Sequence, residues 1–77
     1  MRVYTLKEGI GNMPSRLKGR KFTIRKNPIT ESVVFLDPET SEFLYETMSV
    51  VSTRYYDNGD IVLVTEFGGI YDLMKTN

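Results

Sequence analysis

The chain contains no cysteine and no histidine, and these two absences exclude several kinds of site. Without cysteine there is no disulfide and no thiolate nucleophile or metal ligand. Without histidine the usual general acid–base group near neutral pH is missing, and a structural zinc site is excluded. No serine has a histidine to activate it. The sequence therefore predicts no catalytic, cofactor-binding or metal-binding residues, and we expect that the protein is not an enzyme.

Long hydrophobic runs are also missing. No stretch approaches the roughly 20 apolar residues that a membrane-spanning helix needs, and the first residues are not followed by the apolar run of a signal peptide. We therefore expect a cytoplasmic protein that does not enter a membrane. Its 77 residues form one domain, residues 1–77. A core of this size rarely supplies more than about 3–5 kcal/mol of net stability, so close packing or association must support the fold.

The charges are balanced overall but are unevenly distributed along the chain. Residues 1–26 carry eight Lys or Arg residues against one Glu, a net charge of +7, whereas residues 27–77 carry two against nine acidic residues, a net charge of −7. Such asymmetry indicates either a basic interaction surface or two parts of one fold that attract each other.

The most concentrated positive charge lies in residues 16–26, which we call the basic segment. It contains six basic residues and no acid. Basic side chains along a small barrel are typical of nucleic-acid binding, although a solvated basic face is the simpler interpretation because the net charge of the chain is zero. Phe22 and Ile24 alternate with these residues and are expected in the core. The candidate contacts with nucleic acid or an acidic partner are Arg16, Lys18, Arg20, Lys21, Arg25 and Lys26.

The C-terminal part predicts a three-stranded antiparallel meander over residues 50–56, 61–65 and 70–74. Asn58-Gly59 is typical of a two-residue hairpin turn, since both residues of a type I′ turn need positive φ. Gly68-Gly69 predicts a second tight turn. These turns together predict one buried face, made of Val51, Thr53, Tyr55, Val62, Val64, Tyr71 and Leu73.

The opposite face of this meander is too apolar to be fully solvated. Either barrel closure buries it, the N-terminal segment lies across it, or a partner docks on it, and aromatic residues and Met are enriched where proteins meet. The candidate protein interface comprises Arg54, Tyr56, Leu63, Phe67, Ile70 and Met74.

Further strands are predicted upstream at residues 2–6, 20–25, 32–36 and 43–46, with a long loop at residues 7–19. Short strands, many turns and no clear helix indicate an all-β protein. The predicted fold is a small SH3-like barrel of five to six antiparallel strands with a long N-terminal loop.

The pattern that runs from Val51 and Thr53 through Gly59–Thr65 to Gly69–Leu73 resembles the end of short uncharacterised proteins of Gram-positive phages and mobile elements. Leu17-Lys18-Gly19-Arg20, ahead of a strand, is similar to small SH3-like barrels. The resemblance implies a non-enzymatic accessory protein and assigns no functional residue. The sequence predicts a module that binds a protein partner or a second copy of itself, and nucleic-acid binding through residues 16–26 is the alternative.

Overall fold

The structure is a computed structural model that describes residues 1–9 and 11–76. These residues form seven strands and two short 3₁₀ helices, and no α-helix occurs among them. In chain order the elements are β1 (Tyr4–Leu6), η1 (Ser15–Leu17), β2 (Thr23–Lys26), β3 (Val33–Leu36), β4 (Phe43–Glu46), β5 (Val50–Tyr55), β6 (Ile61–Thr65), η2 (Glu66–Gly68) and β7 (Ile70–Lys75).

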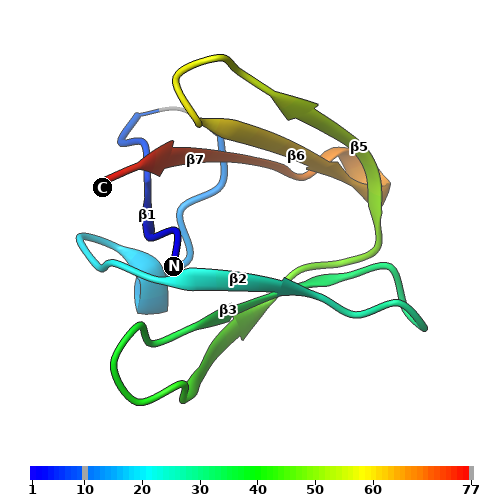
Figure 1. The fold of residues 1–77 in the computed structure, drawn as a ribbon. Coiled ribbons are helices and arrows are strands. Elements are labelled where there is room, and N and C mark those ends of the chain that lie inside the picture. The colour runs from blue at the N-terminus through cyan, green and yellow to red at the C-terminus, as the bar shows by residue number, and fades with distance from the viewer. Residues whose placement is uncertain (10, 77) are drawn as a thin grey trace.

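The strands form two antiparallel sheets that face each other (Figure 1). One has four strands in the order β1-β7-β6-β5, and the other has three in the order β2-β3-β4. The sheets meet through one bridge, in which Tyr4 and Phe22 exchange main-chain hydrogen bonds of 2.8 and 2.9 Å, and through the chain from β4 to β5. The all-β class is confirmed. The prediction of a barrel of five to six strands is wrong in two respects, because seven strands form and the barrel is not closed.

The core between the sheets is built around aromatic rings. Phe35 is fully buried, and its ring centroid lies 4.7 Å from that of Phe22, 6.1 Å from that of Tyr45 and 6.0 Å from that of Tyr71. The expectation that Phe22 and Ile24 belong to the core is confirmed, with Ile24 partly buried at its margin. Because these rings come from β3, β4 and β7 and from the residue immediately before β2, the aromatic contacts join the two sheets.

The first hairpin of the meander has a register that differs from the predicted one. The Tyr56 N–H donates to the Asp60 carbonyl at 2.9 Å, so the loop has three residues, Asp57 to Gly59, with Gly59 at a φ of 95°. A turn that ends in a left-handed glycine is a common three-residue hairpin loop. As a result Tyr55 pairs with Ile61 and not with Val62. A slip of one residue exchanges the two faces of a strand relative to its neighbour.

The second hairpin is also longer than predicted. The Thr65 N–H donates to the Gly69 carbonyl at 2.8 Å, which places η2 inside the turn and pairs Leu63 with Tyr71. The buried positions of β6 are therefore Ile61, Leu63 and Thr65, while Val62 and Val64 are half-buried on the other side. The predicted core face is therefore wrong for Val62 and Val64 of β6, and also for β5, where Val51, Thr53 and Tyr55 are exposed. It is confirmed for Tyr71 and Leu73 of β7.

The long loop after β1 lies along the edge of β7. The Lys7 N–H donates to the Asp72 carbonyl at 2.9 Å, and Asn12 and Ile70 are joined by hydrogen bonds of 2.6 and 3.0 Å. The loop then enters η1, whose Leu17 is fully buried. Across the described part of the chain, no helix has the length and apolar character to cross a membrane. The cytoplasmic location stays a prediction.

Candidate interaction surfaces

The side of the four-stranded sheet that points away from the core carries an apolar surface. The register places Arg54, Val62 and Asp72 in one row across β5, β6 and β7, and Ser52, Val64 and Ile70 in the next row. The residues that we call the outer face are Arg54, Tyr56, Val62, Val64, Ile70 and Met74. Tyr56, Ile70 and Met74 are 47%, 41% and 39% exposed. The long loop follows the β7 edge and leaves this face open to solvent.

The outer face corresponds to the predicted protein interface with one correction. Arg54, Tyr56, Phe67, Ile70 and Met74 are exposed, as that prediction required. Leu63 is only 2% exposed and belongs to the core, because the three-residue loop turns it inward. Val62 and Val64 take its place on the surface. Sequence analysis missed them because residues 61–65 are apolar or β-branched at every position, so only the register distinguishes the two faces.

Phe67 is the most exposed aromatic side chain among the described residues, at 91%. It lies within η2, between β6 and β7, and has a φ of 63°. A bulky residue with positive φ is an outlier, and such backbone strain costs about 1–3 kcal/mol and persists only where the surrounding structure holds it. The Glu66 N–H donates to the Ser49 carbonyl at 2.9 Å and holds this turn in place. The fold thus presents an aromatic ring to solvent at a strained position.

A shallow hollow of about 540 Å³ adjoins the outer face at the β5–β6 hairpin. Its lining residues are Lys7, Tyr56, Asp57, Asn58, Asp60, Val62 and Asp72. Asp60 accepts hydrogen bonds from the Asn58 amide at 3.1 Å and from the Lys75 main-chain N–H at 3.0 Å, which fixes it as part of the hairpin. In the described ranges, no group of three or more acidic residues is arranged to hold a metal ion.

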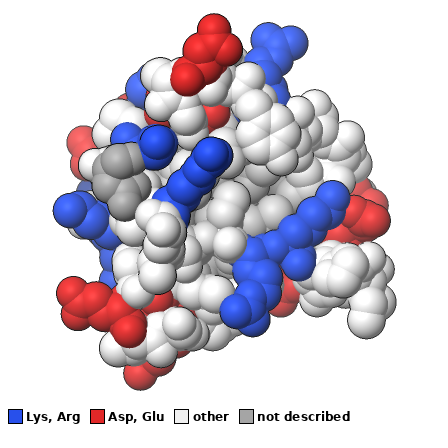
Figure 2. Space-filling model, in the orientation of Figure 1, with Lys and Arg blue, Asp and Glu red and all other residues white. Residues whose placement is uncertain are grey.

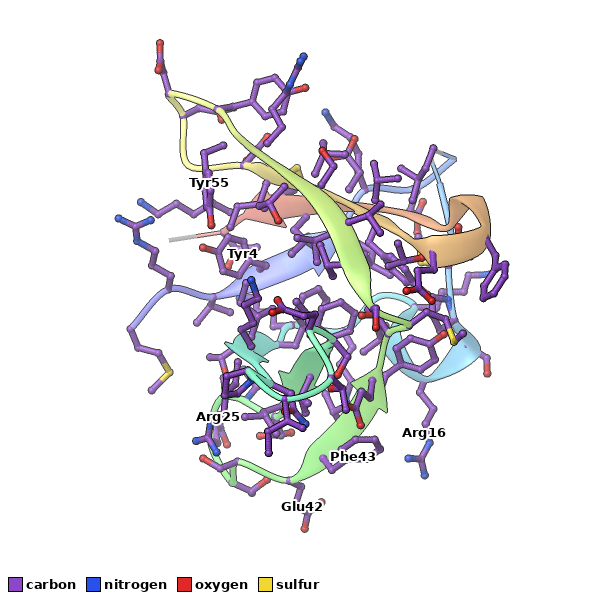
Figure 3. The ribbon with its side chains drawn as sticks, turned by 90° about the vertical axis from the view of Figure 1, so that its right-hand side faces the viewer. Tyr4, Arg16, Arg25, Glu42, Phe43 and Tyr55 are labelled. Carbon is purple, nitrogen blue, oxygen red and sulfur yellow. The ribbon has the colours of Figure 1, made fainter. Side chains whose placement is uncertain are left out.

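The basic segment does not form one continuous positive surface. Arg16 and Arg25 lie on opposite sides of the three-stranded sheet in Figure 3, and the Arg16 guanidinium donates to the Leu44 carbonyl at 3.4 Å. Lys26 pairs with Glu31 at 3.1 Å, and Lys18 lies beside a separate hollow near Glu8. On the face shown in Figure 2, acidic side chains lie among the basic ones around the rim. The strand pairing thus brings basic and acidic parts of the chain together.

Arg20 and Asp37 form the longer ion pair of this region, at 4.0 Å. The main-chain N–H groups of Thr40 and Glu39 donate to the Asp37 carboxylate at 3.0 and 2.8 Å. These hydrogen bonds, with a smaller contribution from Arg20, hold the pKa of Asp37 below its usual value of 3.8. Asp37 therefore stays ionised at neutral pH and offsets the charge of Arg20. Lys21 remains exposed beside them.

Tyr71 is a core side chain whose pKa departs strongly from its usual value. Its hydroxyl lies 3.1 Å from that of Tyr45, and the Tyr71 side chain is almost fully buried. Burial, together with the hydrogen bond to Tyr45, raises the pKa of Tyr71 well above its usual value of 10.0. The pair links β4 to β7, and the raised pKa keeps the Tyr71 hydroxyl in the neutral form. We interpret it as a structural contact between the sheets.

This pair predicts a loss of stability in alkaline solution. Above pH 10 the Tyr71 hydroxyl ionises in the unfolded chain but stays protonated in the fold, so the free energy of unfolding falls as pH rises, by up to about 1.4 kcal/mol per pH unit for one group. In urea titrations between pH 8 and 11.5, Tyr71→Phe should reduce this slope. Tyr55→Phe, at an exposed position, is the control and should leave it unchanged. Equal slopes in the wild type and Tyr71→Phe would contradict the assignment.

In comparisons with known proteins, no protein-family model, curated protein or solved structure gives a significant match to this chain. The functional assignment therefore rests on the surfaces described above.

Proposed function

We propose that this protein is a non-enzymatic binding module of SH3-like architecture that docks another protein on its outer face. The observation that carries the proposal is the register, which gathers Val62, Val64 and Ile70 on one side of the sheet with Tyr56 and Met74 beside them. Apolar and aromatic side chains that stay together on a solvated sheet face are typical of protein interfaces. Arg54 and Asp72 flank the apolar rows and provide polar contacts at fixed positions.

Phe67 lies at the β6–β7 turn, at one end of the sheet that carries the outer face. Its exposed ring is anchored on a backbone that is already ordered by the Glu66–Ser49 hydrogen bond. Rigid exposed aromatic residues contribute much of the binding energy at protein interfaces, since little conformational freedom is lost when they dock. We therefore assign Phe67 as an anchor of the docking surface.

The SH3-like architecture is supported by the path of the chain. A long loop follows the first strand, and β4 leads into β5 through only three residues, so that one bent segment serves both sheets. A meander of β5, β6 and β7 completes the four-stranded sheet with β1. This plan, and the resemblance of residues 51–73 to small phage-type proteins, support an accessory role in which the β-sheet scaffold serves binding.

The test is capture from an extract of the cells that produce the protein, followed by reconstitution with the purified partner. Ile70→Lys should weaken the measured affinity at least about tenfold, because it buries a charge at the centre of an apolar contact. Phe43→Lys is the matched control, since Phe43 is exposed on the three-stranded sheet, and it should change the affinity less than about twofold. Affinity lost with Phe43→Lys and retained with Ile70→Lys would contradict the proposal.

The nucleic-acid alternative is tested on the same preparations. Its supporting observation is that Lys18 and Lys21 are exposed. Fluorescence anisotropy with a single-stranded oligonucleotide, measured over a range of salt concentrations, should show no specific binding at physiological salt. Tight binding that weakens steeply with salt and is lost in Lys18→Glu/Lys21→Glu would favour nucleic acid over a protein partner.

A further inference from the structure

The loop of the β5–β6 hairpin contains the dipeptide Asn58-Gly59, whose chemistry the proposed docking does not use. The main-chain nitrogen of the residue after an asparagine attacks the carbon of the asparagine side-chain amide most readily where that residue is glycine, because glycine has no side chain to hinder the approach. This reaction makes asparagine one of the thermolabile residues of proteins. Asn58 is exposed to solvent, so both water and base reach it.

The reaction is deamidation, and it needs only water as a reactant. A base removes the proton of the Gly59 main-chain nitrogen, which forms a bond to Cγ of Asn58, and the side-chain nitrogen leaves as ammonia. A five-membered succinimide ring remains. Water then opens the ring at one of its two carbonyl carbons and returns a proton to the nitrogen. Attack at Cγ yields aspartate at position 58, and attack at the main-chain carbonyl yields isoaspartate, in which the main chain runs through the side-chain carbon.

The folded hairpin engages both reacting groups in hydrogen bonds. The Gly59 N–H donates to the Tyr56 carbonyl at 3.0 Å, and this bond must break before the nitrogen loses its proton. The Asn58 amide nitrogen donates to the Asp60 carboxylate at 3.1 Å, and the Asn58 amide oxygen accepts from the Asp60 main-chain N–H at 3.0 Å. Asp60 is itself held by the Lys75 main-chain N–H at 3.0 Å. The side-chain amide is thus fixed to residue 60, and its reaction requires that the loop first open.

Neither product of the reaction fits the closed loop. A carboxylate at position 58 has no N–H to donate, so the hydrogen bond to the Asp60 carboxylate is lost and two negative groups face each other. Asp57 adds a third negative charge at the next position. Isoaspartate also lengthens the main chain within the three-residue loop, which the Tyr56–Asp60 hydrogen bond closes. Deamidation therefore weakens the hairpin.

We propose that Asn58 is a modification site at which the closed hairpin suppresses deamidation, and that the reaction proceeds when the hairpin opens and then hinders its reclosure. β5 lies at the edge of its sheet and pairs with β6 alone (Figure 1), and such segments open locally at a lower free energy than the core. The modification is therefore a lasting mark of earlier opening, and it adds negative charge to the hollow that Asn58 lines. It depends on the loop alone and is independent of the docking function.

The first test measures deamidation by mass spectrometry of the proteolytic peptide that contains residue 58, after incubation at mildly alkaline pH. The folded wild type should react at least about tenfold more slowly than the same protein in urea, because only the open fraction reacts. Asp60→Ala, which removes a partner of Asn58, should accelerate the reaction of the folded protein about fivefold. Asp57→Ala is the matched control, since its side chain takes no part in these hydrogen bonds, and it should change the rate less than about twofold. In urea all three chains should react equally fast.

The second test measures the effect of the product on the hairpin. In Asn58→Asp, hydrogen exchange of the Tyr56 main-chain amide, which donates across the loop, should be about fivefold faster than in the wild type. The Thr65 amide, which donates to Gly69 in the other hairpin, is the control and should exchange at an unchanged rate.

Three results would overturn the inference. The first is a wild type that deamidates at Asn58 as fast in the folded state as in urea, or faster. The second is an Asp60→Ala variant that is folded by circular dichroism and reacts no faster than Asp57→Ala. The third is an unchanged exchange rate of the Tyr56 amide in Asn58→Asp, which would mean that the closed loop accommodates the product.

Discussion

Replacement of Phe35 by Ala should leave most of the protein unfolded at 25 °C. Phe35 is fully buried and contacts aromatic rings from both sheets, those of Phe22, Tyr45 and Tyr71. Removal of a buried phenyl ring costs about 3–5 kcal/mol, because apolar contacts are lost and a cavity remains. A domain of this size has a total stability of about the same magnitude. The midpoint of thermal unfolding followed by circular dichroism should therefore fall below or close to room temperature.

The matched control is Phe43→Ala. Phe43 lies on β4, close to Tyr45 in sequence, but is 56% exposed and lies on the solvent side of its sheet. Surface substitutions usually change the free energy of unfolding by no more than about 0.5 kcal/mol. Similar losses in the two variants would mean that Phe35 is not the centre of the core.

The second large effect is expected at Leu63. Leu63→Ala should lower the free energy of unfolding by about 2–5 kcal/mol, because the side chain is 2% exposed between the two sheets. Val64→Ala should lower it by about 1 kcal/mol or less, since Val64 is half-buried on the outer face. Urea titrations of both variants measure the difference directly. A greater loss in Val64→Ala than in Leu63→Ala would restore the register predicted from the sequence.

The strands themselves could be predicted from local patterns. Residues 43–46 and 61–65 form strands with the predicted bounds, and the other strands differ from their predictions by one to three residues at one end or at both. Apolar β-branched runs bounded by Asn, Gly and Pro identify strands because the local backbone preferences and burial agree there. The meander of β5, β6 and β7 and the inward direction of Phe22 also followed from the sequence.

The faces of the strands could not be predicted in the same way. Asp57-Asn58-Gly59 fits either a two-residue loop at Asn58-Gly59 or a three-residue loop that ends in Gly59, and the structure adopts the second. At the next turn Phe67 takes a positive φ, which no local rule predicts for a bulky residue. Both registers therefore shift by an odd number of residues. The two predicted registers agreed on one apolar face only by coincidence, because β6 is apolar on both sides.

The prediction of the interaction surfaces also depended on which face of each strand is buried. Arg54, Ile70 and Met74 were assigned to the correct side of the sheet and are exposed. Leu63 was assigned to the wrong side, and Val62 and Val64 occupy the surface in its place. The dispersal of the basic segment could not be foreseen, since it depends on tertiary contacts such as Arg20 with Asp37.

The account depends most on the β5–β6 register, because it decides which side chains face solvent and which residues form the hairpin loop. Nuclear Overhauser contacts between Hα protons measure it in the unmodified protein, since these protons are close only in directly opposed, non-hydrogen-bonded pairs. We predict contacts of Thr53 with Leu63 and of Tyr55 with Ile61. Contacts of Thr53 with Val64 and of Tyr55 with Val62 would contradict the outer face and the three-residue loop together.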